Sequence, residues 1–227
     1  MKKIIYALCM FSFILLTNSC RRTTITPTDP APTSVTDIDG NVYGVVKIGN
    51  QYWSTENLRT TRYNDGTAIP TGLSNTAWSA ATTGACAVYN DDPNNNTTYG
   101  KLYNWHAVNT GKLAPTGWHV PSSTEWDEMV NALGGFAVAG GKMKSTSSLW
   151  VTPNTGADNS SGFNALPSGY KGMGGGYSVI GKAAYWWQRD ERNASQGNYI
   201  DVSNDLPSTF SNGATKTFGY AIRLVKD

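Results

Sequence analysis

The sequence is poor in the residues from which most catalytic and metal sites are built. It has only two histidines and three cysteines among 227 residues, and it contains neither HExxH nor CxxC. A zinc site needs several nitrogen or sulfur ligands at close spacing, so a zinc centre of these types is excluded. The GxxxxGK[ST] pattern of a phosphate-binding loop does not occur either. We therefore expect a protein that is not an enzyme and that carries no metal or cofactor.

Charged residues are also scarce, and they balance once the N-terminal segment is set aside. Asp, Glu, Lys and Arg make up 15% of the chain, with 18 basic against 16 acidic side chains. Lys2 and Lys3 account for the formal net charge of +2, which leaves the rest of the chain neutral. A neutral chain lacks the basic field of a nucleic-acid-binding protein, so no nucleic-acid partner is expected.

The N-terminus has a hydrophobic run that is too short to span a membrane. Lys2 and Lys3 precede the run Ile4 to Leu16, which is about 13 residues, whereas a spanning helix needs about 20. Small or polar residues follow at positions 17–19. A basic start, a short apolar stretch and a small residue before the cut are typical of a secretory signal. We interpret residues 1–19 as a lipoprotein signal peptide.

Cys20 stands where such a signal peptide would be cleaved and the new N-terminus acylated. Leu16 lies four residues before it instead of three, a looser pattern that resembles lipoproteins of the Bacteroides group. Several acyl chains on one cysteine would anchor the protein durably. Residues 20–36 are rich in Thr and Pro and are expected to form a lipidated tether. The expected localisation is the cell envelope, in the outer membrane, with the periplasmic and surface faces both open.

Two local patterns in the remaining chain predict regular structure. Residues 42–48 are rich in β-branched side chains, and Gly49-Asn50 separates them from residues 51–53, which predicts a β-hairpin. Ser122 and Glu125 have the spacing of a capping box, and an apolar stripe continues to Leu133. A second helix is expected over residues 99–108. Short strands are expected at residues 85–89, 185–187, 199–202 and 220–225.

Several longer segments resemble one family, the Fibrobacter-type major paralogous domain known as FISUMP. These segments are DIDGNVYGVVKIGNQYWSTENL, YNDGTAIP, YGKLYNWHAV, PTGWHVPSSTEWDEM, GFNALPSGY and GYAIRLVKD. The resemblance covers residues 37–227, which we take as one domain. It implies an α+β fold of the C-type-lectin-like kind, with two short helices, small antiparallel sheets and long loops. It also implies similarity to formylglycine-generating enzymes, which use a pair of cysteines for copper. Cys86 would be the one free cysteine after lipidation of Cys20, so that chemistry is not expected here.

Aromatic side chains are the most promising candidates for a ligand site. The chain has eight tryptophans and twelve tyrosines, and several lie beside Gly-rich loops in the second half. Flat rings with polar neighbours suit sugar stacking or protein contact. Trp186 and Trp187 should face opposite sides of a strand, so that one could be exposed. The candidate ligand-binding residues are Tyr177, Tyr185, Trp186, Trp187 and Tyr199, with burial in the core as the alternative for each.

The run from Asp91 to Asn96 offers oxygen atoms of the kind that bind calcium. Asn and Asp runs more commonly form solvated turns, and the sequence leaves the calcium question open.

The sequence thus leads to one hypothesis and two alternatives. The hypothesis is an envelope lipoprotein whose lectin-like domain recognises a glycan or a protein, in adhesion or polysaccharide handling. The first alternative is a structural or assembly component of the envelope without a soluble ligand. The second is an enzyme on the formylglycine-type scaffold, for which Cys86 would have to act as a nucleophile. The membrane, through the lipid, is the one partner expected on chemical grounds.

Overall fold

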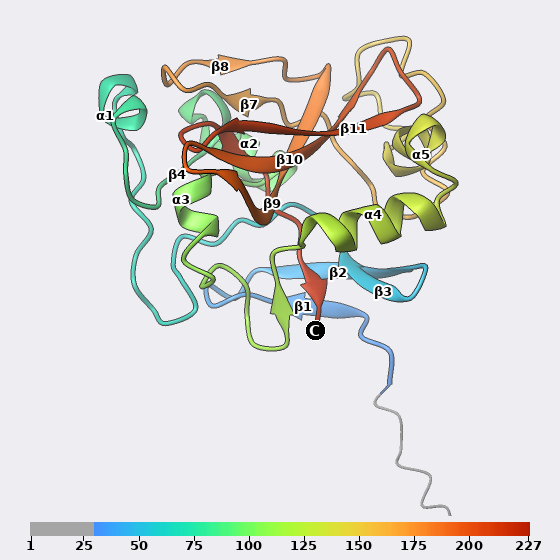
Figure 1. Cartoon of the computed structure of the whole chain (residues 1–227), viewed down its shortest axis with the longest axis horizontal. Helices are drawn as coiled ribbons and strands as arrows, with labels where there is room; N and C mark the ends of the chain where they lie inside the picture. The colour runs from blue at the N-terminus through green and yellow to red at the C-terminus, as the bar shows by residue number, and fades with distance from the viewer. Residues whose placement is uncertain (1–29) are drawn as a thin grey trace, which may run out of the picture. The chain divides into compact units, whose positions relative to one another are not determined.

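The computed structural model describes residues 30–227, which are coloured in Figure 1. Residues 32–227 form one compact unit, and the fold described below is that of this unit. The expected signal peptide and the expected lipidation at Cys20 lie outside the described residues. Within residues 30–227, no helix has the length and apolar character needed to cross a bilayer.

A five-stranded antiparallel sheet brings the first and last strands of the folded unit together. Its order is β1 (Ser34–Thr36), β2 (Val42–Ile48), β3 (Gln51–Ser54), β13 (Val225–Lys226) and β6 (Trp118–His119). The expected hairpin is confirmed, because β2 pairs with β3 across Gly49-Asn50. Strand β1 lies within the segment that the sequence pattern assigned to the tether, and Val35 is buried in the core. The folded unit therefore begins near Pro32, earlier than the expected boundary after residue 36.

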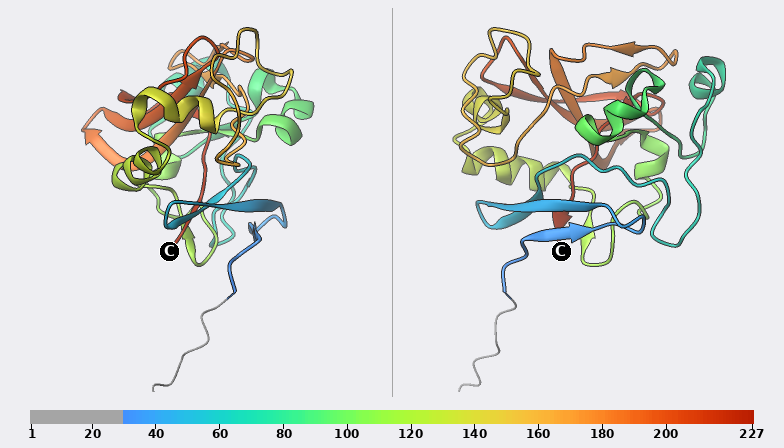
Figure 2. Two further views of the ribbon diagram at one scale, coloured as in Figure 1. Left: turned by 90° about the vertical axis from the view of Figure 1, so that its right-hand side faces the viewer. Right: turned by 180° about the vertical axis from the view of Figure 1, so that it is seen from behind.

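Two further antiparallel sheets form the other half of the molecule (Figures 1 and 2). One has the order β4 (Cys86–Ala87), β5 (Leu102–Asn104), β12 (Gly219–Tyr220), β7 (Tyr170–Lys171) and β8 (Tyr177–Ser178). The other has the order β11 (Thr209–Thr215), β10 (Gln196–Ser203) and β9 (Ala183–Asn193). The strands expected at residues 185–187 and 199–202 are thus confirmed as parts of β9 and β10. The segment 220–225 is divided between β12 and β13, which belong to different sheets.

Five short α-helices occur in the described part of the chain, where two were expected. They are α1 (Asn75–Ser79), α2 (Pro93–Tyr99), α3 (Trp105–Val108), α4 (Ser123–Ala132) and α5 (Phe136–Met143). The capping box of α4 is confirmed, because the Ser122 hydroxyl accepts from the Glu125 N–H and a Glu125 carboxylate oxygen accepts from the Ser122 N–H. Helix α4 lies between the first sheet and the β9–β10–β11 sheet (Figure 2). The architecture is α+β with mostly antiparallel sheets.

The helix expected over residues 99–108 is wrong in its middle, residues 100–104. Residues 102–104 form the strand β5, which is buried between β4 and β12. Tyr99 ends α2, and the last part of the range is the helix α3, which starts where the Asn104 side chain accepts from the Ala107 N–H at 3.1 Å. A strand with both faces buried has apolar residues on both sides, and this pattern resembles that of a short helix.

The aromatic core joins the halves of the molecule around α4. Trp53, Trp126, Phe163 and Trp186 are fully buried, and the ring centroids of Trp53 and Trp126 lie 4.6 Å apart. Phe163 and Trp186 meet edge to face at 5.5 Å. Large rings bury much apolar surface each, so this cluster contributes strongly to the stability of the fold.

A buried cation lies beside this cluster. Arg223 donates through Nε to the side-chain oxygen of Asn57 at 2.8 Å and through Nη1 to the carbonyls of Ser54 and Phe163 at 2.7 and 2.9 Å. Its Nη2 donates to the carbonyl of Asn164 at 3.2 Å. The guanidinium group therefore connects the end of β3, the loop before β7 and the segment between β12 and β13.

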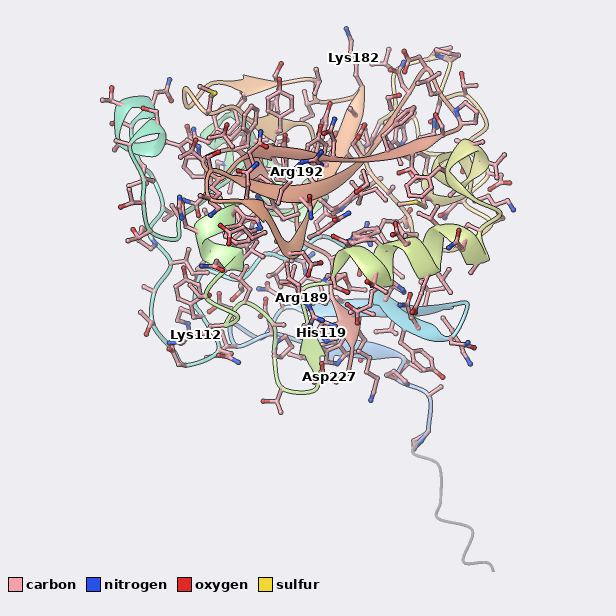
Figure 3. All side chains as sticks on the ribbon, in the orientation of Figure 1. Lys112, His119, Lys182, Arg189, Arg192 and Asp227 are labelled. Carbon is pink, nitrogen blue, oxygen red and sulfur yellow. The ribbon has the colours of Figure 1, made fainter. Side chains whose placement is uncertain are left out.

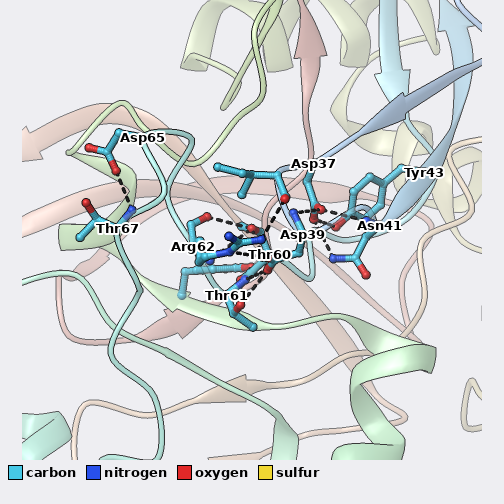
Figure 4. A network of polar contacts seen from close by, with 11 residues as sticks. Asp37, Asp39, Asn41, Tyr43, Thr60, Thr61, Arg62, Asp65 and Thr67 are labelled. Carbon is cyan, nitrogen blue, oxygen red and sulfur yellow. Dashed lines mark hydrogen bonds and ion pairs between the residues drawn. The ribbon is translucent and has the colours of Figure 1, made fainter.

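A polar network holds the turn between β1 and β2 against the segment that follows β3 (Figure 4). The carboxylate of Asp37 accepts from the Tyr43 hydroxyl at 2.5 Å and from the Asn41 N–H at 2.9 Å. Asp39 binds Arg62 Nε at 2.6 Å and accepts from the Thr61 hydroxyl at 2.7 Å. The carboxylates of this acidic turn are thus occupied by groups of the protein itself.

The Asp39 contacts predict a loss of stability in acid. Burial opposes ionisation of Asp39, but hydrogen bonds from Thr61 and Arg62 outweigh it and lower the pKa from 3.8 to about 2. Because the folded-state pKa is the lower one, the stabilisation is complete above about pH 4 and is lost as the pH falls towards about 2. Asp39→Asn should therefore unfold at a lower temperature than the wild type at pH 6, and the difference should vanish near pH 2.

Thermal unfolding followed by circular dichroism between pH 6 and pH 2 measures this difference. Asp127→Asn, at an exposed position on α4, is the matched control and should follow the wild type throughout. A gap for Asp39→Asn that stays constant down to pH 2 would contradict the assignment.

Candidate functional site

Two of the five candidate ligand-binding residues are core residues. Trp186 and Trp187 face opposite sides of β9 as expected, and both are fully buried, so the alternative of burial in the core holds for both. The indole N–H of Trp186 donates to Asn57 at 2.8 Å, and that of Trp187 donates to the Tyr103 carbonyl at 2.8 Å. Both faces of β9 are covered at this point, one by the α4 cluster and the other by β5 and β12. Neither indole can contact a ligand.

Tyr177 lies away from the other candidates, on β8. Its hydroxyl donates to Asp91 at 2.7 Å, and its ring lies 4.0 Å from Nζ of Lys171. Trp78 lies 5.2 Å from the same ammonium group, which is buried and has no hydrogen-bond partner within residues 30–227. A cation enclosed by aromatic faces is stabilised by the ring quadrupoles. Tyr177 therefore shields Lys171.

The polar run from Asp91 to Asn96 forms the start of a helix. Asp92 is the N-cap of α2 and accepts from the Asn94 N–H at 3.0 Å, with Pro93 in the first turn. Asp91 is bound by the Tyr177 hydroxyl. Among residues 30–227, no three His, Cys, Asp or Glu side chains come together in a way that could hold a metal ion.

The remaining two candidates, Tyr185 and Tyr199, line one hollow. The hollow is open to solvent, has a volume of about 380 Å³ and lies where β7, β9, β10, β11 and β12 meet. Tyr170, Phe218 and Tyr220 complete its aromatic lining. All five rings are half-buried except that of Tyr220, which forms the floor at 4% exposure.

The rings of this aromatic hollow support one another. Tyr185 stacks on Tyr220 with centroids 5.1 Å apart and planes within 18°. Tyr170 meets the edge of both rings, and Tyr199 lies 5.0 Å from Tyr220. Offset stacks and edge contacts of this kind fix ring orientation. The hollow is therefore a preformed surface of rings on a rigid sheet.

Polar groups in and around the hollow are free to meet a ligand. Within residues 30–227, the hydroxyls of Tyr170, Tyr185, Tyr199 and Tyr220 have no hydrogen-bond partner. None of the four oxygens is fully buried, so solvent or a ligand can reach them. Burial raises the pKa values of the Tyr185, Tyr199 and Tyr220 hydroxyls, so these hydroxyls stay protonated at neutral pH. Each can then donate and accept one hydrogen bond at the hollow.

Three of the five aromatic residues that line the hollow were not selected from the sequence. Tyr170 lies in GFNALPSGY, while Phe218 and Tyr220 flank the start of GYAIRLVKD. They reach Tyr185 and Tyr199 only because β12 pairs with β7 and lies against β9. The one signal in the sequence was the high content of aromatics near its C-terminal end.

Within residues 30–227, His119 is not hydrogen-bonded to Cys86. Cys86 is fully buried, and burial raises the pKa of its thiol. His119 binds Asp227 through Nδ1 at 2.5 Å and Glu125 through Nε2 at 2.7 Å, so both of its ring nitrogens are occupied. Figure 3 shows His119 and Asp227 together next to the C-terminal strand.

Comparison with known proteins places the chain in a family. No curated protein and no solved structure matches the chain. The family described as the Fibrobacter succinogenes major domain matches residues 46–226. This range includes every strand that lines the aromatic hollow as well as α4 and Arg223. The chain therefore belongs to the Fibrobacter succinogenes major domain family.

Proposed function

We propose that this protein is a non-enzymatic, lipid-anchored component of the bacterial cell envelope whose domain binds a glycan through the aromatic hollow. The hollow itself carries the proposal. Tyrosine rings offer apolar faces to the C–H face of a sugar ring, and their hydroxyls meet its hydroxyl groups. The hollow is open and shallow, which suits part of an extended chain better than a small molecule that must be enclosed.

A C-type-lectin-like assignment of the fold belongs to the same proposal. In support, the first and last strands of the domain share one sheet, and α4 packs beside it. Residues 144–169 form a long connection without helix or strand between α5 and β7. Long irregular connections on a rigid scaffold often carry binding residues.

The binding proposal predicts that ring removal abolishes glycan recognition. Tyr185→Ala and Tyr199→Ala should each weaken binding by about 10-fold or more to a glycan that has been selected on a broad array. Each variant removes one stacking ring, whose contribution to the binding free energy is about 1.4 kcal/mol. Tyr52→Ala, at a half-buried tyrosine of the first sheet, is the matched control and should bind like the wild type. Isothermal titration with the selected glycan measures the affinities.

Two outcomes would count against this proposal. An array on which the wild type binds nothing would favour a structural role in the envelope, or a protein ligand. Equal affinities of the wild type and both hollow variants would place the glycan elsewhere on the protein.

The proposed anchor depends on Cys20, which lies outside the described residues. Cells that express the wild type and are fed radiolabelled palmitate should yield a labelled protein in the membrane fraction. Cys20→Ala should carry no label and should leave that fraction. Cys86→Ala is the control and should stay labelled, because its thiol is buried in the domain. Label that persists in Cys20→Ala would contradict the anchor.

A further inference from the structure

The aromatic hollow has a carboxylate beside it that forms no ion pair within residues 30–227. Asp201 lies on β10 directly opposite Tyr185 on β9, and it shares a face of the sheet with Tyr199, two residues earlier. Within residues 30–227, its side chain has no hydrogen bond or ion pair, and desolvation is the one influence on its ionisation. Burial raises the pKa of Asp201 to about 6, so it is mostly charged at pH 7.

The charge of Asp201 acts on the lining of the hollow. Burial first, and the Asp201 charge second, raise the pKa values of the Tyr185 and Tyr199 hydroxyls. A partly desolvated carboxylate without a partner costs free energy in the unliganded protein, and a ligand that supplies a counter-charge recovers it. The unliganded hollow therefore lacks a counter-charge for Asp201.

A positively charged side chain also lies near the hollow. Gly213 lines the hollow, and a side chain built at that position would lie 2.1 Å from Cδ of Arg192, so the arginine stem crosses the glycine. Figure 3 shows Arg192 on the β9–β10–β11 sheet. The Arg192 charge lowers the pKa of Tyr199, opposite in sign to the effect of Asp201. One negative and one positive side chain therefore act on the Tyr199 hydroxyl.

We propose that the ligand is a saccharide that carries a free ammonium group, with Asp201 as its counter-ion. This inference rests on the proposed function of the hollow. The ammonium group would lie at the Asp201 end, over rings whose faces attract cations. An N-acetylated unit lacks the positive charge, and a uronic acid would be repelled by Asp201.

Two tetrasaccharides that differ only in acetylation test the charge requirement. Tetra-glucosamine should bind the full-length protein at pH 6.5 and low salt at least about 10-fold more tightly than tetra-N-acetylglucosamine, and 0.5 M salt should reduce the difference. Asp201→Asn should lose this preference. Asp205→Asn, at an exposed position in the loop between β10 and β11, is the matched control and should keep it.

A second variant keeps the test informative if Asp201→Asn folds poorly. Arg192→Gln changes an exposed residue and removes the positive charge near the hollow, which would repel an ammonium group. This variant should bind tetra-glucosamine about 2- to 3-fold more tightly than the wild type. Arg189→Gln, another exposed change on β9, should have no effect.

The outcomes separate this inference from the proposed function. Equal binding of both tetrasaccharides, or unchanged preference in a folded Asp201→Asn, overturns the ammonium inference but leaves glycan binding in place. The saccharide assignment would be overturned if choline displaced tetra-glucosamine while Tyr185→Ala and Tyr199→Ala bound tetra-glucosamine as tightly as the wild type. A wild-type protein that binds no glycan at all would overturn the proposed function itself.

Discussion

Replacing Arg223 by methionine should lower the free energy of unfolding by about 3–5 kcal/mol, the largest effect we expect from a single substitution. The side chain is 1% exposed and donates four hydrogen bonds, three to backbone carbonyls and one to Asn57. Methionine fills a similar volume but removes the guanidinium donor from the carbonyls of Ser54, Phe163 and Asn164, each at a cost of about 1–3 kcal/mol before relaxation. The Asn57 oxygen keeps the Trp186 indole N–H as a donor. Burial lowers the pKa of Arg223 to about 9, so the group remains charged at pH 7.

Urea unfolding followed by tryptophan fluorescence measures this loss, because Trp186 and Phe163 lie against the guanidinium group. Arg223→Lys should fall between methionine and the wild type, since a lysine keeps the charge but cannot reach all four acceptors. Arg189→Met, at an exposed arginine, is the control and should change stability by less than about 0.5 kcal/mol. A loss below about 1 kcal/mol for Arg223→Met would show that the buried hydrogen bonds contribute little.

Gly140→Ala should destabilise the protein by about 1–3 kcal/mol, although alanine favours helices over glycine by about 1 kcal/mol. Gly140 lies in α5, where an added Cβ would meet the Ser208 carbonyl oxygen at 2.1 Å. The neighbouring N–H of Gly141 donates to the Pro207 carbonyl at 2.7 Å, so α5 rests directly on the backbone before β11. Backbone atoms cannot rotate away, and the helix would have to move as a whole.

The control for this prediction is a glycine in open surroundings. Gly174→Ala has no atom within 4 Å of the added Cβ and should be neutral or slightly stabilising. Denaturant unfolding of both variants gives the comparison. If Gly140→Ala proved more stable than the wild type, helix propensity would outweigh the close approach of α5 to residues 207–208.

Features whose causes are local along the chain were predictable from the sequence. The capping box at Ser122 and Glu125 and the stripe that ends at Leu133 locate α4 because all contacts of a cap lie within one turn. The β2–β3 hairpin follows in the same way from Gly49-Asn50 between two strand-forming runs. Both elements are within one or two residues of their predicted bounds.

Elements whose causes are distant in sequence were not predicted. Helix α5 contains the pair Gly140-Gly141. In isolation such a pair is typical of a turn, but here the absence of side chains lets the helix pack closely against residues 156 and 208. Strand β5 resembles part of a helix until its burial between β4 and β12 is known. In both cases tertiary contacts outweigh local preference.

The candidate ligand site divides along the same line. The sequence by itself determined the family, the neutral charge of the chain after its first residues, the scarcity of metal ligands and the abundance of aromatics near the C-terminal end. Only the tertiary structure decided which rings are available. Trp186 and Trp187 are buried because β9 is covered on both faces. Tyr185 and Tyr199 lie beside rings from β7 and β12 and form the hollow with them. Alternation along a strand sets the side to which a residue points, but the neighbours on that side come from distant segments, and these decide its exposure.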